Sequence, residues 1–148
     1  MKINMCGGVL TMPYNLAKWL RRKNIDVTLF LDPCSRDESY SPIWEDEELS
    51  GYGLPSWIKE QNVSLAKFFM GFSNERNFLR RLNDCDLIHT HGEASIWGSF
   101  TEKPYVFQSY GFDLCYMPFL KGSLKQRILS YLIRRGIRKA SKILVLPY

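Results

Sequence analysis

The sequence lacks the short motifs that mark several common enzyme classes. It contains no G-x-G-x-x-G dinucleotide fingerprint, no Walker A phosphate loop and no serine or cysteine in a nucleophile elbow. The first absence argues against an NAD-dependent oxidoreductase, because the pyrophosphate of the cofactor would lack its usual glycine turn. The other two argue against a hydrolase or an NTPase built from this chain alone.

Long apolar runs are missing as well. No uninterrupted apolar segment approaches the roughly 20 residues that a membrane-spanning helix requires. The N-terminus also lacks the apolar core of a signal peptide, because polar residues, glycines and a proline interrupt it before Tyr14. From these two absences we expect a cytoplasmic protein.

Patterns typical of disulfide frameworks and metal sites are absent too. The chain has two histidines, His89 and His91, which leave a zinc site short of ligands, so no metal or other cofactor is expected. The four cysteines have no C-x-x-C spacing, and we expect reduced, mostly buried thiols at Cys6, Cys34, Cys85 and Cys115.

The composition is that of a globular protein. The chain has 148 residues, of which 45% are hydrophobic and 24% charged, and this predicts one domain over residues 1–148. The net charge of +5 is too mild to indicate nucleic-acid binding without a concentrated basic patch, so no nucleic-acid partner is expected.

Strand-like and helix-like segments alternate along most of the chain. The first 31 residues contain a strand, the pair Gly7 and Gly8, a helix and a second strand, which together make one βαβ unit. This alternation predicts a doubly wound, mostly parallel six-stranded α/β sheet. The expected strands are 3–6, 27–31, 63–69, 86–90, 105–109 and 142–146. The expected helices are 12–23, 74–83, 94–100 and 123–141. Asn74 is the expected cap of the second helix.

One stretch breaks the alternation. Residues 33–62 have no clear periodicity and contain an acidic cluster at 45–48, which predicts an irregular insertion with one helical turn near 56–61. Such a long connection is either functional or merely solvated, and the sequence leaves both interpretations open. The middle region is rich in aromatic residues, namely Tyr52, Trp57, Phe68, Phe69 and Phe72. Core packing explains most of them, and stacking against an acceptor is the alternative.

The expected helix over 123–141 is amphipathic. At about 100° per residue, six aliphatic side chains fill one broad side: Leu124, Ile128, Leu129, Leu132, Ile133 and Ile137. The opposite side is basic, and it is either a solvated helix surface or a strip that contacts anionic lipid headgroups. This basic side consists of Arg127, Arg134, Arg135, Arg138 and Lys142.

Residues suited to ligand binding follow several of the expected strands. His91 and Glu93 follow the fourth strand, and Tyr110 and Asp113 follow the fifth. Because the carboxyl ends of parallel strands meet at one edge, these residues are expected to converge there with Gly7 and Gly8.

The same residues have simpler structural interpretations. His89 shares a strand face with His91, but we expect it to be a core residue. Glu93 and Asp113 are candidates for a general base, for acceptors of ligand hydroxyls, or for helix caps. Tyr110 offers its hydroxyl to a ligand or packs against its loop.

Four stretches resemble the N-terminal domain of GT-B glycosyltransferases of glycosyltransferase family 4 (group 1). The opening GG…LAKWLRRKNIDVTLF looks like the Gly-Gly loop of that family and its following helix, with Asn24 where glycine is usual. DLIHTHG is similar to its D-(V/I)-(V/I)-H-x-H strand end, and PYVFQSYGFDL is similar to its P-x-V-x-(T/S)-x-H-G-x-D segment. RKASKILVLPY looks like the strand that closes the N-terminal half.

The resemblance implies a Rossmann-like sheet that forms one half of a GT-B fold. It also implies transfer of a sugar, with retention and without a required metal, from a nucleotide-sugar donor to a sugar or lipid-linked acceptor. Gly7 and Gly8 would approach the donor diphosphate and the acceptor. His91 and Glu93 would line the acceptor side.

The candidate catalytic residues implied by the resemblance are Tyr110 and Asp113. Asp113 would occupy the acidic position of the family after the fifth strand. Tyr110 stands where the family has histidine, and a tyrosine hydrogen-bonds but does not take up a proton near pH 7, because its reference pKa is about 10.

The chain ends at Tyr148, before the second domain of that family. We therefore expect it to be inactive alone, since half a cleft holds the donor poorly and does not exclude water. The expected partners are a C-terminal donor domain in cis or in trans and, through the basic helix, an anionic membrane contacted peripherally. The alternative is a stand-alone Rossmann-like binding or regulatory module without catalysis.

Overall fold

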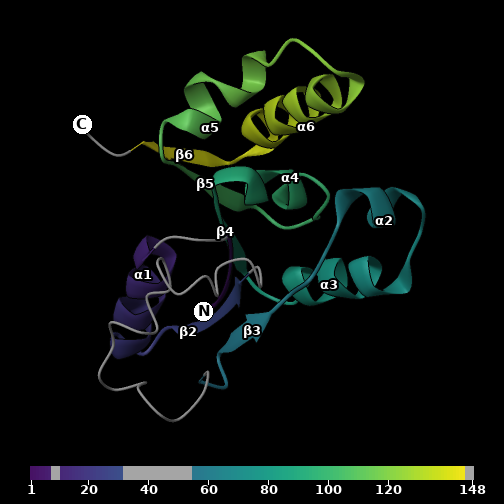
Figure 1. The fold of residues 1–148 in the computed structure, drawn as a ribbon. Coiled ribbons are helices and arrows are strands. Elements are labelled where there is room, and N and C mark those ends of the chain that lie inside the picture. Colours follow the sequence, from purple (N-terminus) through teal and green to yellow (C-terminus); the bar gives the residue numbers. More distant parts are fainter. Residues whose placement is uncertain (8–10, 32–54, 146–148) are drawn as a thin grey trace.

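Six parallel strands form one sheet with helices packed against it (Figure 1). The computed structural model describes residues 1–7, 11–31 and 55–145. The strand order is β3-β2-β1-β4-β5-β6, and every neighbouring pair is parallel. This Rossmann-like α/β architecture confirms the predicted fold class. The strands are β1 (Lys2–Cys6), β2 (Asp26–Leu31), β3 (Ile58–Glu60), β4 (Leu87–His91), β5 (Tyr105–Ser109) and β6 (Lys142–Val145).

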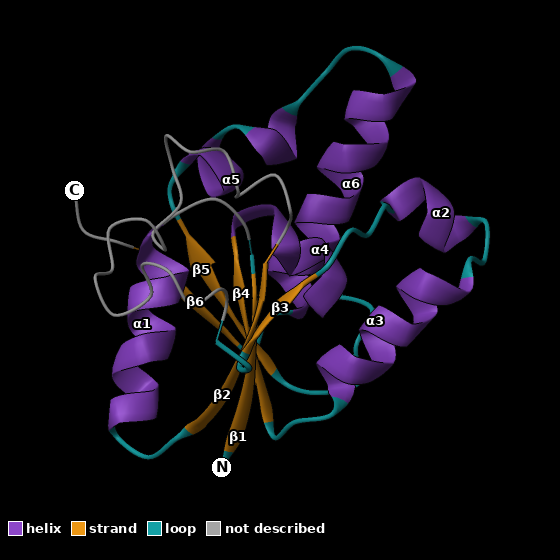
Figure 2. Ribbon diagram, turned by 60° about the horizontal axis from the view of Figure 1, so that its bottom comes forward, coloured by secondary structure: helices purple, strands orange, loops and turns teal. Residues whose placement is uncertain are grey.

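The helices lie on both sides of the sheet. Figure 2 shows α1 on one side and α3 and α4 on the other, while α6 packs against α4 and the short turn η3. The α-helices are α1 (Thr11–Arg22), α2 (Leu65–Phe69), α3 (Ser73–Asn83), α4 (Ser95–Gly98), α5 (Phe112–Cys115) and α6 (Leu124–Lys139), and the 3-10 turns are η2 (Gly92–Ala94) and η3 (Met117–Phe119).

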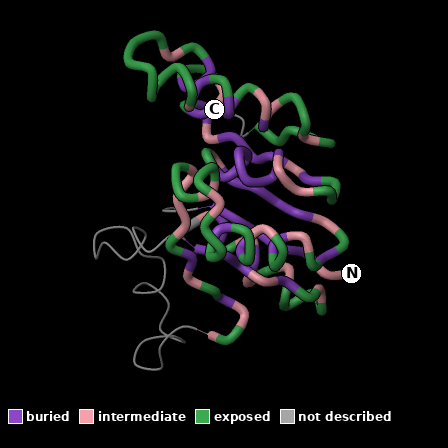
Figure 3. Tube along the Cα trace, turned by 90° about the vertical axis from the view of Figure 1, so that its right-hand side faces the viewer, coloured by how far each residue is buried: buried purple, intermediate pink, exposed green. Residues whose placement is uncertain are grey.

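The core is split between the two faces of the sheet, because successive strand residues point to opposite sides. Ile3 and Met5 of β1 belong to the cluster that packs with α1, whereas Cys6 belongs to the cluster that packs with α3. Figure 3 shows the buried segments running through the middle of the molecule. β1 therefore lies between two apolar layers, and its carboxyl end is held firmly in place.

A buried polar residue fixes α3 to the sheet. The side-chain amide of Asn4 donates to the carbonyl oxygens of Arg81, at 2.9 Å, and Leu82, at 3.0 Å. These carbonyls lie in the last turn of α3, where no further turn of the helix follows to satisfy them. The Arg81 carbonyl also accepts the backbone N–H of Asp84, at 3.2 Å. Asn4 thus satisfies the end of the helix and sets the position of α3 relative to β1.

The prediction of the third strand from the sequence is wrong. Residues 65–69 form α2, not part of a strand over 63–69, and the third strand is Ile58–Glu60, where a helical turn was expected. Leu65 and Phe68 both pack against the core, which is the i, i+3 spacing of a helix. β3 is short and polar, and it is a strand because it pairs with β2. The predicted insertion over 33–62 therefore ends too late, and its part from 33 to 54 lies outside the described residues.

Two helix predictions also need correction. The helix α3 begins at Ser73 after Phe72, and Asn74 does not cap it but donates through its side chain to the Asn62 carbonyl at 3.1 Å. In α6, Leu124 and Ile128 are 73% and 48% exposed instead of buried, because the first turns of that helix extend beyond the core cluster that contains its later residues.

The described cysteines are free thiols, as expected. Cys6 and Cys85 are buried and Cys115 is exposed, while Cys34 lies outside the described part of the chain. Among the helices that the structure describes, none has the length and apolar character needed to cross a bilayer.

The packing of α6 against α4 predicts the effect of one substitution, Gly136→Ala. A Cβ at Gly136 would lie 2.8 Å from the carbonyl oxygen of Ser95, so the helices would have to separate. Alanine normally favours a helix over glycine by about 1 kcal/mol, but here we expect a loss of about 1–3 kcal/mol in the free energy of unfolding. Urea denaturation measures it. Arg134→Ala, at an exposed position of α6, should change stability by less than about 0.5 kcal/mol, and a stabilised Gly136→Ala variant would contradict the tight packing.

Candidate functional site

The strand order places a crevice between β1 and β4. From β1 the chain proceeds outward to β2 and β3, and then returns to β4 on the other side of β1 before it continues to β5 and β6. In open parallel sheets, ligands bind outside the carboxyl ends of the strands at such a switch in direction. Here those ends are Cys6 of β1 and His91 of β4. The two strands are paired, so their carboxyl ends lie next to each other.

Gly7 allows these two strand ends to approach closely. Its φ is +149°, a backbone conformation that side chains rarely permit. A Cβ at Gly7 would lie 2.6 Å from the Cβ of His91 and 2.8 Å from the His91 carbonyl oxygen. Glycine is therefore required here by the contact with His91 itself.

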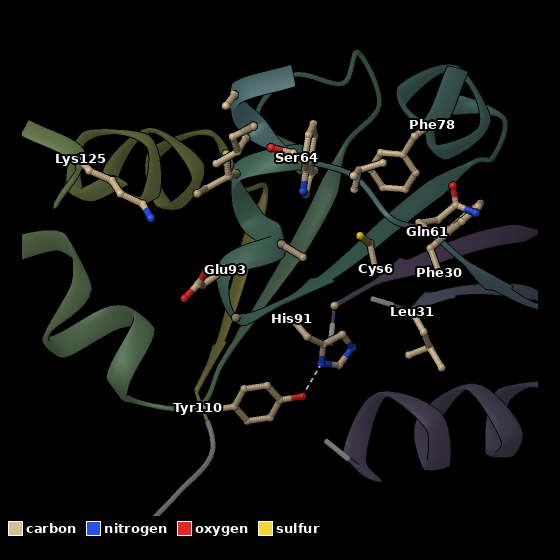
Figure 4. A pocket seen from close by; sticks show the side chains of 18 residues that line it. Cys6, Phe30, Leu31, Gln61, Ser64, Phe78, His91, Glu93, Tyr110 and Lys125 are labelled. Carbon is tan, nitrogen blue, oxygen red and sulfur yellow. Dashed lines mark hydrogen bonds between the residues drawn. The ribbon is translucent and has the colours of Figure 1, made fainter. Parts of the chain in front are cut away.

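A cavity of about 670 Å³ opens beside these strand ends (Figure 4). Its volume lies within the range of about 300–1,000 Å³ that is typical of small-molecule sites. Its walls are largely apolar, with a few polar side chains. It is lined by Cys6, Gly7, Phe30, Leu31, Gln61, Val63, Ser64, Leu65, Ala66, Phe78, His91, Gly92, Glu93, Ala94, Ile96, Trp97, Tyr110 and Lys125.

A hydrogen bond joins His91, at the end of β4, to Tyr110, directly after β5. Nδ1 of His91 lies 2.7 Å from the hydroxyl of Tyr110, a hydrogen bond drawn in Figure 4. The ring of His91 also stacks on that of His89, with centroids 4.5 Å apart. The two histidines do share one face of β4, as their spacing predicted, and His89 is buried as expected of a core residue.

Burial keeps both imidazoles neutral. Desolvation lowers the pKa of His91 to about 3, with His89 acting in the same direction, and it lowers the pKa of His89 to about 4 against a hydrogen bond with Gln108. Burial, and then the charge of Asp113, raise the pKa of the Tyr110 hydroxyl. The proton therefore stays on Tyr110, so this pair holds two rings in a fixed orientation and does not exchange a proton.

Asp113 builds the loop that carries Tyr110. Its Oδ1 accepts hydrogen bonds from the Ser109 hydroxyl, at 2.8 Å, and from the backbone N–H of Tyr110, at 3.0 Å. The Ser109 oxygen in turn accepts the N–H of Gly111, whose φ is +96°. This network sets the turn between β5 and α5. Tyr110 is thus positioned by a carboxylate that itself does not line the cavity.

The second oxygen of Asp113 faces the end of β4. Oδ2 is buried and has no hydrogen-bond partner among the described residues. A Cβ at Gly92 would lie 3.7 Å from it, so Asp113 approaches the backbone directly after His91. An unpaired buried carboxylate oxygen is costly, which makes this oxygen a candidate acceptor for a ligand hydroxyl or a water molecule.

Glu93 supplies a second carboxylate, on the wall of the cavity. It lies in η2, directly after β4, and Figure 4 shows its side chain on the same side of the cavity as Lys125. Burial raises the pKa of Glu93, and the nearby charge of Asp113 raises it further. Glu93 is therefore suited to accepting a hydrogen bond from a ligand hydroxyl.

Most of the residues singled out in the sequence come together. Gly7, His91, Glu93 and Tyr110 line one cavity, and Asp113 supports it from behind. Gly8 lies outside the described residues, as do Tyr52 and the acidic cluster at 45–48.

The sequence analysis missed other lining residues. Gln61 and Ser64 line the cavity, but the sequence predicts a helical turn near 56–61 and a strand over 63–69 instead of β3 and α2, so neither residue is expected there. Lys125 belongs to the first turn of α6, and only the tertiary structure brings that turn to the cavity. No local pattern distinguishes it from the other basic residues of the helix.

The low pKa values of the two histidines predict a pH dependence of stability. The unfolded chain takes up protons below about pH 6.5, whereas the folded imidazoles remain neutral down to about pH 4. The free energy of unfolding should therefore be largest above pH 6.5 and fall toward pH 4, by about 1.4 kcal/mol per pH unit for each histidine.

Imidazole ¹⁵N NMR in the folded protein checks this directly. His89→Gln assigns the two rings, since the chain has no other histidine. Both rings should stay neutral at pH 5. His91→Gln should remove the contribution of one histidine, about 1.4 kcal/mol per pH unit, from the pH dependence of the free energy of unfolding. A titration midpoint near 6.5 for His91 in the folded chain would contradict the burial argument.

Comparison with known proteins identifies the family of the chain. No curated protein matches the chain in a sequence search. The family model of Glycosyltransferase Family 4, however, matches residues 6–146, a range that begins at the end of β1 and runs past β6. Because the match includes both strand ends of the crevice and nearly the whole sheet, the chain belongs to glycosyltransferase family 4.

Proposed function

We propose that the chain is the acceptor-side half of a GT-B glycosyltransferase, a Rossmann-like domain over residues 1–148. It would take part in transfer of a sugar from a nucleotide-sugar donor to a sugar or lipid-linked acceptor. The observation that carries the proposal is the convergence of His91, Glu93 and Tyr110 in one cavity, at the switch in strand order of a family 4 chain.

The cavity suits an acceptor that carries hydroxyl groups. The Glu93 carboxylate accepts a hydrogen bond from such a hydroxyl, and its raised pKa brings it closer to that of an effective general base. Tyr110 lines the same cavity, and its hydroxyl is oriented by the hydrogen bond with His91. The apolar walls lower the local polarity around these groups, which strengthens each hydrogen bond.

Asp113 and Tyr110 contribute by position in this proposal. Asp113 holds the turn that carries Tyr110, so it acts on the substrate through its neighbour. Gly7 brings the ends of β1 and β4 together, and in this proposal the donor diphosphate approaches the crevice at this turn. Placing donor and acceptor in a reactive geometry supplies a large share of the rate enhancement in such a transfer.

A second domain would supply the donor site. The cavity described above is bounded by strands and helices of one domain, and a GT-B enzyme reacts in a cleft between two domains. We therefore infer that the chain turns over no nucleotide sugar until a C-terminal donor domain, in the same polypeptide or in another, closes the cleft.

The inferred requirement for a donor domain is tested by sugar transfer. The purified chain is incubated with radiolabelled UDP-glucose, UDP-N-acetylglucosamine or GDP-mannose and a panel of sugar and lipid-linked acceptors, with and without a donor domain of family 4. Transfer is expected only with the donor domain. Turnover by the chain alone would overturn the inferred dependence. Binding without transfer in both arms would favour a binding or regulatory module.

Tyr110→Phe tests the role of the hydroxyl in the active combination. Removing one neutral hydrogen bond should lower kcat/KM roughly 2- to 12-fold, since such a bond contributes about 0.5–1.5 kcal/mol. Tyr116→Phe is the matched control, because Tyr116 is exposed and does not line the cavity, and it should leave kcat/KM unchanged. Equal rates for both variants would remove Tyr110 from the proposed machinery.

A further inference from the structure

Large apolar side chains are exposed where α2 ends. Phe69, Met70 and Phe72 are 59%, 66% and 51% exposed, and we call these three residues the apolar tip. Core packing, the interpretation favoured from the sequence, thus holds for Phe68 but not for Phe69 or Phe72. Consecutive exposed side chains of this size indicate a surface that contacts something other than water.

A row of cations on α6 lies beside this tip. Arg134, Arg135, Arg138 and Lys139, which we call the basic stripe, line a shallow hollow of about 450 Å³ together with Tyr131. They belong to the second half of the helix, at i, i+1, i+4 and i+5, so they project from one side of it. Figures 1 and 2 both show α2 and α6 as neighbouring helices.

Phe100 joins the tip to the stripe. Its ring centroid lies 5.9 Å from that of Phe69, and the guanidinium carbon of Arg135 lies 4.8 Å from the centroid of the same ring. The tip and the stripe are therefore parts of one continuous surface. Nε of Arg135 is buried and has no hydrogen-bond partner in the part of the chain that the structure describes, which leaves it a donor in need of an acceptor.

The charged side chains of α6 all have one sign. The helix α6, described over its whole length, carries six lysines and arginines and no acidic residue. On the other side of the tip, Lys67 is exposed, and the Arg76 guanidinium packs against Gly71. Glu75, the acidic residue of α3, is buried and does not offset these charges at the surface.

We propose that the apolar tip and the basic stripe together bind an anionic lipid bilayer. The tip would enter the interface between headgroups and acyl chains, while the stripe contacts lipid phosphates, since cations are attracted to an anionic surface. A second copy of the chain is a poor occupant, because a symmetric contact would bring two basic stripes together. The proposal goes beyond the proposed function and does not depend on it.

Vesicle co-sedimentation of the whole chain tests the proposal. Vesicles of phosphatidylcholine mixed with phosphatidylglycerol should retain the protein, vesicles of phosphatidylcholine alone should retain much less, and added salt should weaken the binding. Arg134→Glu combined with Arg138→Glu should lower the apparent affinity at least 10-fold, because two favourable charges become repulsive. Phe69→Ser combined with Phe72→Ser should also weaken it.

The control variant replaces an exposed aromatic residue and a nearby lysine on a different helix. On α1, Trp19 is 54% exposed, and the ammonium group of Lys23 lies 5.8 Å from its ring centroid. Trp19→Ser combined with Lys23→Glu should leave vesicle binding unchanged. Unfolding midpoints show that each variant is folded. Equal retention by both vesicle types, an equal loss in the control, or retention on double-stranded DNA in place of vesicles would overturn the proposal.

Discussion

The contact between Gly7 and the backbone of His91 is the constraint on which the candidate site depends. It joins the carboxyl ends of β1 and β4, the two strands between which the order of the sheet reverses. A side chain at this glycine would collide with the Cβ of His91 and push the strands apart. The crevice, the position of His91 and the path of the chain into η2 all follow from this approach, so the glycine is structural before it is functional.

Burial then gives the polar groups at this edge fixed roles. The imidazole of His91 is neutral because desolvation disfavours its charged form, and Tyr110 keeps its proton for the same reason. The carboxylate of Asp113 organises the turn between β5 and α5 through the Ser109 hydroxyl and the Tyr110 N–H. The site is therefore a rigid arrangement of donors and acceptors, and this suits a reaction in which positioning two substrates is the main task.

The short helix α2 takes part in both proposed surfaces. Its first residues, Leu65 and Ala66, line the cavity, whereas Phe69 at its end belongs to the apolar tip. Phe68 packs between them against Trp97 and Phe100, so the helix is anchored by aromatic contacts. One helix of five residues thus contributes both to the cavity wall and to the apolar tip.

The sequence by itself determined the sheet architecture and most of the site. Five strands and the longer helices follow from local periodicity. Four of the residues singled out line one cavity because each lies at or just after the carboxyl end of a parallel strand: Gly7, His91, Glu93 and Tyr110. The tertiary structure decided what depends on distant contacts. It made Ile58–Glu60 a strand through pairing with β2, brought Lys125 to the cavity, and left Phe69 exposed, since burial is a property of neighbours that lie far away in the chain.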